Sequence, residues 1–166
     1  MSEDRWERLF ADLSVRSEDD GDLPDLVEAE RVALTLHDRL RAAIGADITV
    51  RADRTDLRGV AVDVGKDWLR LERQGSDIVV ALAWITRISA LGASAPKAGL
   101  ELSLTTLLRA LARSGATIVC AAGGEETSGR VRAVAADHIE IRTESGDAIV
   151  PIAAITHLRA PHAAFE

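Results

Sequence analysis

An internal repeat constrains the fold of this chain more than any other feature. Residues 45–89 are written a second time as residues 115–159, at a constant offset of 70 and without a gap. Of the 45 aligned pairs, 12 are identical, and many others exchange one apolar residue for another. A repeat of this kind predicts two similar structural units that bury their apolar faces together.

Each copy of the repeat contains five short segments with the pattern of β-strands, bounded by Gly, Asp and Ser turns. In the first copy these segments are residues 47–52, 59–64, 67–73, 77–82 and 86–90. In the second copy they are residues 117–122, 129–134, 137–143, 147–152 and 156–160. A single turn, 83–84 or 153–154, is expected between the last two strands of each copy.

A helix is expected before each set of strands. The first begins near Pro24, which suits a first helical turn, and ends at Gly45. The second begins after Ser103, a suitable N-cap, carries a leucine stripe, and ends at Gly115. A short amphipathic helix is also expected near the N-terminus.

This order of elements, with Gly59 or Gly129 opening the second strand, resembles the Sm-like (Lsm) small β-barrel and related SH3-like barrels. The resemblance implies a mainly β fold with helices (α+β): two tandem five-stranded barrels, each preceded by a helix. The expected division is an acidic arm at 1–23, a first helix and barrel at 24–91, a linker at 92–99, and a second helix and barrel at 100–166.

Sm-like proteins are typically RNA-binding, so the resemblance implies an RNA site in the loops of the first barrel. Its contacts would be Trp68, Lys66, Arg51 and Arg58, with the indole stacking on a base. The chain departs from the family pattern because residues 65–68 and 135–138 contain no asparagine, and because no Arg-Gly precedes the last strand. Arg51 and Arg58 also alternate with aspartates, which favours a solvated mixed-charge face.

The acidity of the chain is confined to its first 31 residues. These residues carry eleven Asp or Glu and four Arg, which accounts for the whole formal net charge of −7, and the remainder is balanced. Because nucleic-acid affinity depends on neutralising phosphates, a neutral repeat body disfavours strong non-specific binding to RNA or DNA.

Within the acidic arm, Trp6, Leu9, Phe10 and Leu13 fall on one face of a short amphipathic helix. So short a helix must pack on something to be stable. Two interpretations stay open: the stripe covers the protein's own barrel or helix, or it inserts into a groove on a partner.

Catalytic chemistry is not expected. The four histidines are scattered without ligand spacing, so we predict no metal site and no cofactor. The lone Cys120 aligns with Val50 at an inward strand position, which indicates a small buried side chain rather than a reactive thiol. Neither a secretory signal nor a membrane-spanning run is recognisable, so we expect a cytoplasmic protein without membrane contact.

The sequence therefore predicts a non-catalytic binding or scaffold protein that binds protein in preference to RNA. An RNA-binding Sm-like protein that uses the first barrel is the alternative. Open strand edges are expected to join barrels within one chain or between chains, so the partner is either another protein or a second copy in a homo-oligomer.

Overall fold

The computed structural model describes residues 34–89, 91–92 and 101–165, and Leu36–Glu166 form one compact unit. The expected docking stripe of Trp6, Leu9, Phe10 and Leu13 lies outside the described residues, as does the expected start of the first helix at Pro24.

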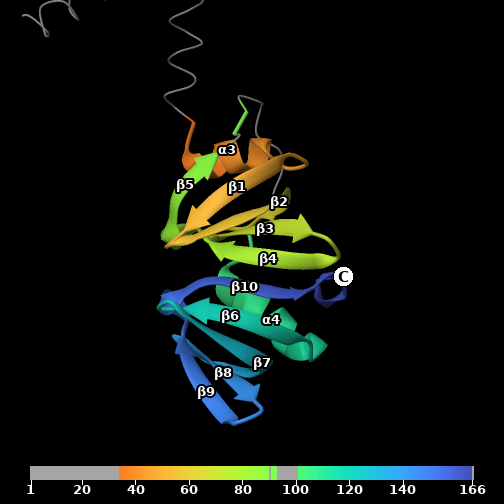
Figure 1. Ribbon diagram of the computed structural model, residues 1–166, viewed down its shortest axis with the longest axis vertical. Coiled ribbons are helices and arrows are strands. Elements are labelled where there is room, and N and C mark those ends of the chain that lie inside the picture. Colours follow the sequence, from red (N-terminus) through yellow and green to blue (C-terminus); the bar gives the residue numbers. More distant parts are fainter. Residues whose placement is uncertain (1–33, 90, 93–100, 166) are drawn as a thin grey trace, which may run out of the picture. The chain divides into compact units, whose positions relative to one another are not determined.

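The compact unit is built on a single antiparallel sheet of ten strands (Figure 1). The first half contributes β1 (Asp47–Ala52), β2 (Thr55–Val64), β3 (Trp68–Arg73), β4 (Ser76–Ala81) and β5 (Ile85–Ser89). The second half contributes β6 (Thr117–Ala122), β7 (Glu125–Val134), β8 (His138–Thr143), β9 (Gly146–Pro151) and β10 (Ile155–Pro161). The strands lie in the order β5-β1-β2-β3-β4-β10-β6-β7-β8-β9.

This order corrects the expected fold class. The prediction of two separate five-stranded barrels, each preceded by its helix, is wrong, because β4 of the first half hydrogen-bonds to β10 of the second and makes the sheet continuous. The sheet is also open, since β5 and β9 stand at its two ends. The strand segments lie close to where the repeat predicts them, except that β2 and β7 begin earlier than predicted, at Thr55 and Glu125, because each preceding turn is shorter. The strand order of the first half recurs in the second.

Two α-helices occur in the described part of the chain. α3 (Leu36–Ala42) precedes β1, and α4 (Leu104–Ser114) precedes β6. The predicted caps of α4 are confirmed: the Ser103 side chain accepts a hydrogen bond from the Thr106 amide, and Gly115 adopts the left-handed conformation at φ 67°. Neither described helix is long and apolar enough to cross a membrane.

Two glycines let neighbouring strands approach closely. A Cβ on Gly59 would lie 2.6 Å from the carbonyl oxygen of Glu72 on β3. A Cβ on Gly129 would lie 2.2 Å from the carbonyl oxygen of Arg142 on β8. The paired glycine of the repeat is therefore required by strand packing, since any side chain would collide with the adjacent backbone.

The two apolar cores of the unit share β4 as a wall. Ile78 and Val80 point into the core of the first half, whereas Val79 and Ala81 point into the core of the second half. Trp68 on β3 also belongs to the second core. Because successive side chains of a strand point to opposite faces, β4 is buried on both faces and seals both cores.

We expect Leu158→Ala on β10 to lower the free energy of unfolding by about 2–5 kcal/mol, because Leu158 is fully buried opposite Val79 in the β4–β10 pairing. Its repeat counterpart Ile88 on β5 is only partly buried, so Ile88→Ala should cost clearly less. Denaturant unfolding of both variants measures the difference. Equal losses would contradict the role assigned to the β4–β10 pairing.

Candidate functional site

The β4–β10 pairing, here called the internal joint, shows how this fold covers a strand edge. Five residue pairs hold it in antiparallel register, from His157 opposite Val80 to Pro161 opposite Ser76. The indole nitrogen of Trp84 adds a hydrogen bond of 3.0 Å to the carbonyl oxygen of Ala153 in the second half. Trp84 thus packs on the other copy of the repeat.

A buried polar cluster fastens one end of the internal joint. Asp77 is completely buried and accepts hydrogen bonds from Arg70 at 2.9 Å and from His162, which follows β10, at 3.0 Å. The Arg70 guanidinium also lies 5.4 Å from the ring centroid of Phe165. The residues after β10 are therefore held on the first half by a carboxylate that water does not reach.

The two edges of the sheet are open in the described part of the chain. Ile149 on β9 is 69% exposed, although its repeat counterpart Val79 on β4 is 1% exposed. On β5, Thr86, Arg87 and Ser89 are exposed. Edge strands present unpaired backbone N–H and C=O groups, which are ready to pair with another strand.

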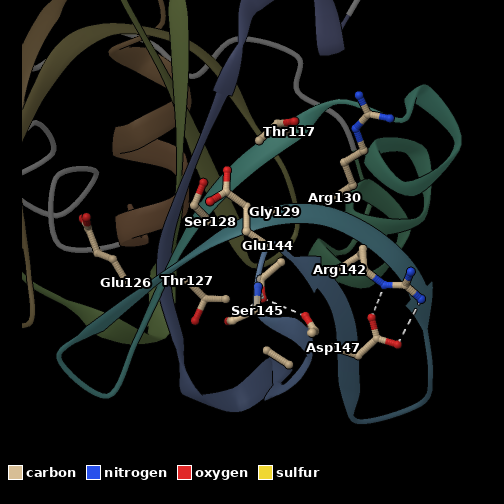
Figure 2. A pocket seen from close by; sticks show the side chains of 13 residues that line it. Thr117, Glu126, Thr127, Ser128, Gly129, Arg130, Arg142, Glu144, Ser145 and Asp147 are labelled. Atoms are coloured by element: carbon tan, nitrogen blue, oxygen red, sulfur yellow. Dashed lines mark hydrogen bonds and ion pairs between the residues drawn. The ribbon is translucent and has the colours of Figure 1, made fainter.

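A polar groove lies beside the β9 edge (Figure 2). It has a volume of about 980 Å³ and is bounded by β7 and the β8–β9 hairpin. The hydroxyl side chains that line it belong to Thr117, Thr127, Ser128, Thr143 and Ser145. In the first half, the corresponding groove measures about 350 Å³ and is also lined by Arg159 from β10. The groove at β9 is thus the larger member of the pair, and no described strand pairs with the free edge of β9 beside it.

Two of the charged side chains that line the groove, Arg142 and Asp147, are paired with each other. Asp147 on β9 binds Arg142, drawn with dashed lines in Figure 2, and accepts a hydrogen bond of 2.8 Å from Arg132. The hydrogen bond from Arg142 holds the pKa of Asp147 below its usual value. A carboxylate held ionised by two arginines is a poor proton donor or acceptor near neutral pH, so these contacts favour a binding surface.

Two of the residues predicted to contact RNA, Lys66 in the loop between β2 and β3 and Trp68 at the start of β3, instead hold the segment that leads into α4. The Trp68 side chain is 1% exposed, and its indole nitrogen donates a 2.9 Å hydrogen bond to the carbonyl oxygen of Leu102. The backbone amide of Lys66 donates to the same carbonyl at 3.0 Å, while the Lys66 residue remains exposed. A base cannot stack on a tryptophan whose ring is buried in the second core.

The other two predicted RNA contacts are engaged with carboxylates. The Nη2 atom of Arg58 lies 2.7 Å from Oδ2 of Asp47, and the Nε atom of Arg51 lies 3.2 Å from Oδ1 of Asp56. The structure therefore places both arginines near the β1–β2 hairpin but away from Trp68. Mixed pairs of this kind fit the solvated face that the alternating charges predict.

Cys120 on β6 is 1% exposed, as its alignment with Val50 predicts. Burial raises the pKa of its thiol to about 11, so the thiolate is scarce at neutral pH. In the described residues, no three His, Cys, Asp or Glu side chains gather as they would around a metal ion.

Sequence reasoning missed the residues that define the open β9 edge, above all Ile149 and Asp147. Both align with buried positions of β4, Val79 and Asp77, so the apolar pattern of the repeat does not separate a covered strand from an open one. The one available signal was the exchange of Ala81 for Pro151, because proline favours edge strands.

A comparison of the chain with protein-family models finds no match, and neither does a comparison with curated proteins.

We expect Asp77→Asn to lower the free energy of unfolding by about 3–5 kcal/mol, because it leaves the partly buried Arg70 without its closest carboxylate. Asp147→Asn is the matched control, since the same repeat position is exposed on β9 and should cost far less. Thermal or urea unfolding at pH 7 measures both. A similar loss in the two variants would show that the Asp77 cluster does not stabilise the joint.

We expect His157 on β10 to make the protein sensitive to acid. Burial, and secondarily Arg159, lower the pKa of His157 below 6.5, and its Nε2 is buried without a hydrogen-bond partner. Below pH 6.5 His157 binds a proton in the unfolded chain but stays neutral in the folded protein. The free energy of unfolding therefore declines as the pH falls from 7 toward the lowered pKa of His157 in the folded state. In His157→Gln the unfolding free energy should fall less between pH 7 and 5.5. An identical pH slope in both proteins would exclude this role.

Proposed function

We propose that this chain is a non-catalytic scaffold that binds another protein by pairing a strand with the open edge of its sheet. The observation that carries the proposal is the exposed Ile149, an apolar side chain that protrudes from an edge strand at a position buried in the other half. In strand addition, backbone hydrogen bonds supply affinity, and pockets for alternate side chains supply specificity.

The internal joint supports this proposal because it is an example of strand addition on the same backbone. There, β10 covers β4 and reduces the exposure of Val79 to 1%. A strand placed on β9 in the same way would cover Ile149 and run along the polar groove. Such a strand would also satisfy the edge amides and carbonyls that now face solvent.

The charge distribution supports a protein partner over a nucleic acid. Residues 32–166 carry equal numbers of acidic and basic side chains, and Arg58 and Arg142 are bound to aspartates. A surface with few unpaired cations gains little from releasing phosphate counterions. The cytoplasmic location expected from the sequence remains part of this proposal.

The test is site-specific photocrosslinking of the full chain in cells. The photoreactive amino acid p-benzoylphenylalanine replaces Ile149 in one protein, and in a control it replaces Val60, which is 39% exposed on the doubly paired strand β2. Crosslinks to protein should form at position 149 and be scarce at position 60. Equal crosslinking at both positions, or none at 149, would contradict strand addition at β9.

A further inference from the structure

The second core is completed by side chains that come from the first half. Trp68, Val79 and Ala81 reach across the internal joint and join the core beneath α4. With them in place, Ile155 and Leu158 at the joint are 1% and 0% exposed. The second half therefore depends on three plug residues, which is the name used below for Trp68, Val79 and Ala81.

The repeat places a second set of plug residues on the opposite end of the sheet. The counterparts of Trp68, Val79 and Ala81 are His138, Ile149 and Pro151. Ile149 is 69% exposed and Pro151 is exposed, so in the described residues this set enters no core.

The first core shows the complementary deficit. Ile85 and Ile88 on β5 are only partly buried, whereas their counterparts at the internal joint, Ile155 and Leu158 on β10, are fully buried. The described residues include no plug residues for this core, because β5 forms the free end of the sheet. One end of the sheet thus carries an unused plug, and the other end carries an incompletely covered core.

We propose that the occupant of both edges is a second copy of this chain, bound head to tail, with β9 of one copy paired to β5 of the next. This inference rests on the proposed strand addition and names its partner. The internal joint supplies the register: shifted by one repeat, it sets Arg87 opposite Val150, Ile88 opposite Ile149, and Ser89 opposite Ala148. Ile149 then covers Ile88 as Val79 covers Leu158.

The side chains at this register are compatible with the pairing. Pro151 corresponds to Ala81, which lies beyond the five residue pairs of the internal joint, so its missing amide removes no hydrogen bond from the new joint. Ser89 takes the place of Arg159, so the groove beside β9 receives a small hydroxyl and not a guanidinium. At the internal joint, Asp77 is bound by His162, which follows β10. Its counterpart Asp147 does not require such a histidine from the next chain, because Arg142 and Arg132 already bind it.

Head-to-tail pairing leaves each added copy with a free edge, so the assembly either closes into a ring or grows as a filament. A β9-to-β9 dimer would instead use the same edge twice and leave the first core of both chains uncovered. These two arrangements respond differently to variants at the two edges.

The test uses the variants Ile149→Asp and Ile88→Lys in the full chain, with Val60→Asp as a control on a strand paired on both sides. Light scattering after size exclusion measures mass over a range of concentrations. Wild type and the control should run at multiples of the 17.8 kDa chain mass. A charge in an apolar joint should weaken association by at least about 100-fold, so each edge variant alone should run as one chain.

The mixture of the two edge variants is the decisive sample. The Ile149→Asp chain retains an intact β5, and the Ile88→Lys chain retains an intact β9, so an equimolar mixture should form a complex of at least two chains. Circular dichroism confirms that each variant is folded. If Ile88→Lys still associates by itself and Ile149→Asp does not, the β9-to-β9 dimer is correct and the head-to-tail proposal fails.

The measured masses also distinguish self-association from the broader proposal of strand addition at β9. Wild type at 17.8 kDa throughout, together with crosslinks from position 149 to a different protein, would overturn self-association and leave strand addition standing. Failure of both measurements would overturn both.

Discussion

The pairing of β4 with β10 is the interaction on which the rest of the unit depends. It makes two five-stranded halves into one sheet, and it places Val79 and Leu158 opposite each other with almost no exposure. Without β10, β4 would expose an apolar face to water along most of its length. Burial of that face favours a single cooperative structure over two independent barrels, because a barrel of such small size has little core of its own.

The composition of β4 follows from its position between two cores. Its residues 78–81 read Ile-Val-Val-Ala, an apolar run without polar alternation, which is typical of a strand buried on both faces. Asp77 begins the run and is tolerated at zero exposure only because Arg70 and His162 bind both of its oxygens. The strand therefore joins the halves by apolar packing along its length and by a charged cluster at one end.

Much of the local structure could be predicted from the sequence, and the way the halves join could not. The strand segments, the Ser103 cap and the left-handed Gly115 depend on neighbouring residues, so periodicity and turn chemistry reveal them. Pairing between β4 and β10 joins residues about 80 positions apart, and both strands have the same repeat pattern as strands that remain at the edge. For the same reason the sequence predicts an exposed loop position for Trp68, although the second half buries its ring and the carbonyl oxygen of Leu102 accepts its indole N–H.

The two copies of the repeat differ most informatively where one faces the internal joint and the other faces an edge. Trp68 fills a core across the joint, and its counterpart His138 binds the exposed Asp137. Asp77 is buried by partners from both halves, whereas Asp147 finds two arginines within its own half. Ile149 differs from these polar edge positions, because it is a large apolar side chain at an exposed site where a polar side chain could stand without loss of packing. An edge strand guarded against pairing usually carries charge at such a position, so the exposed isoleucine favours the proposed pairing at this edge.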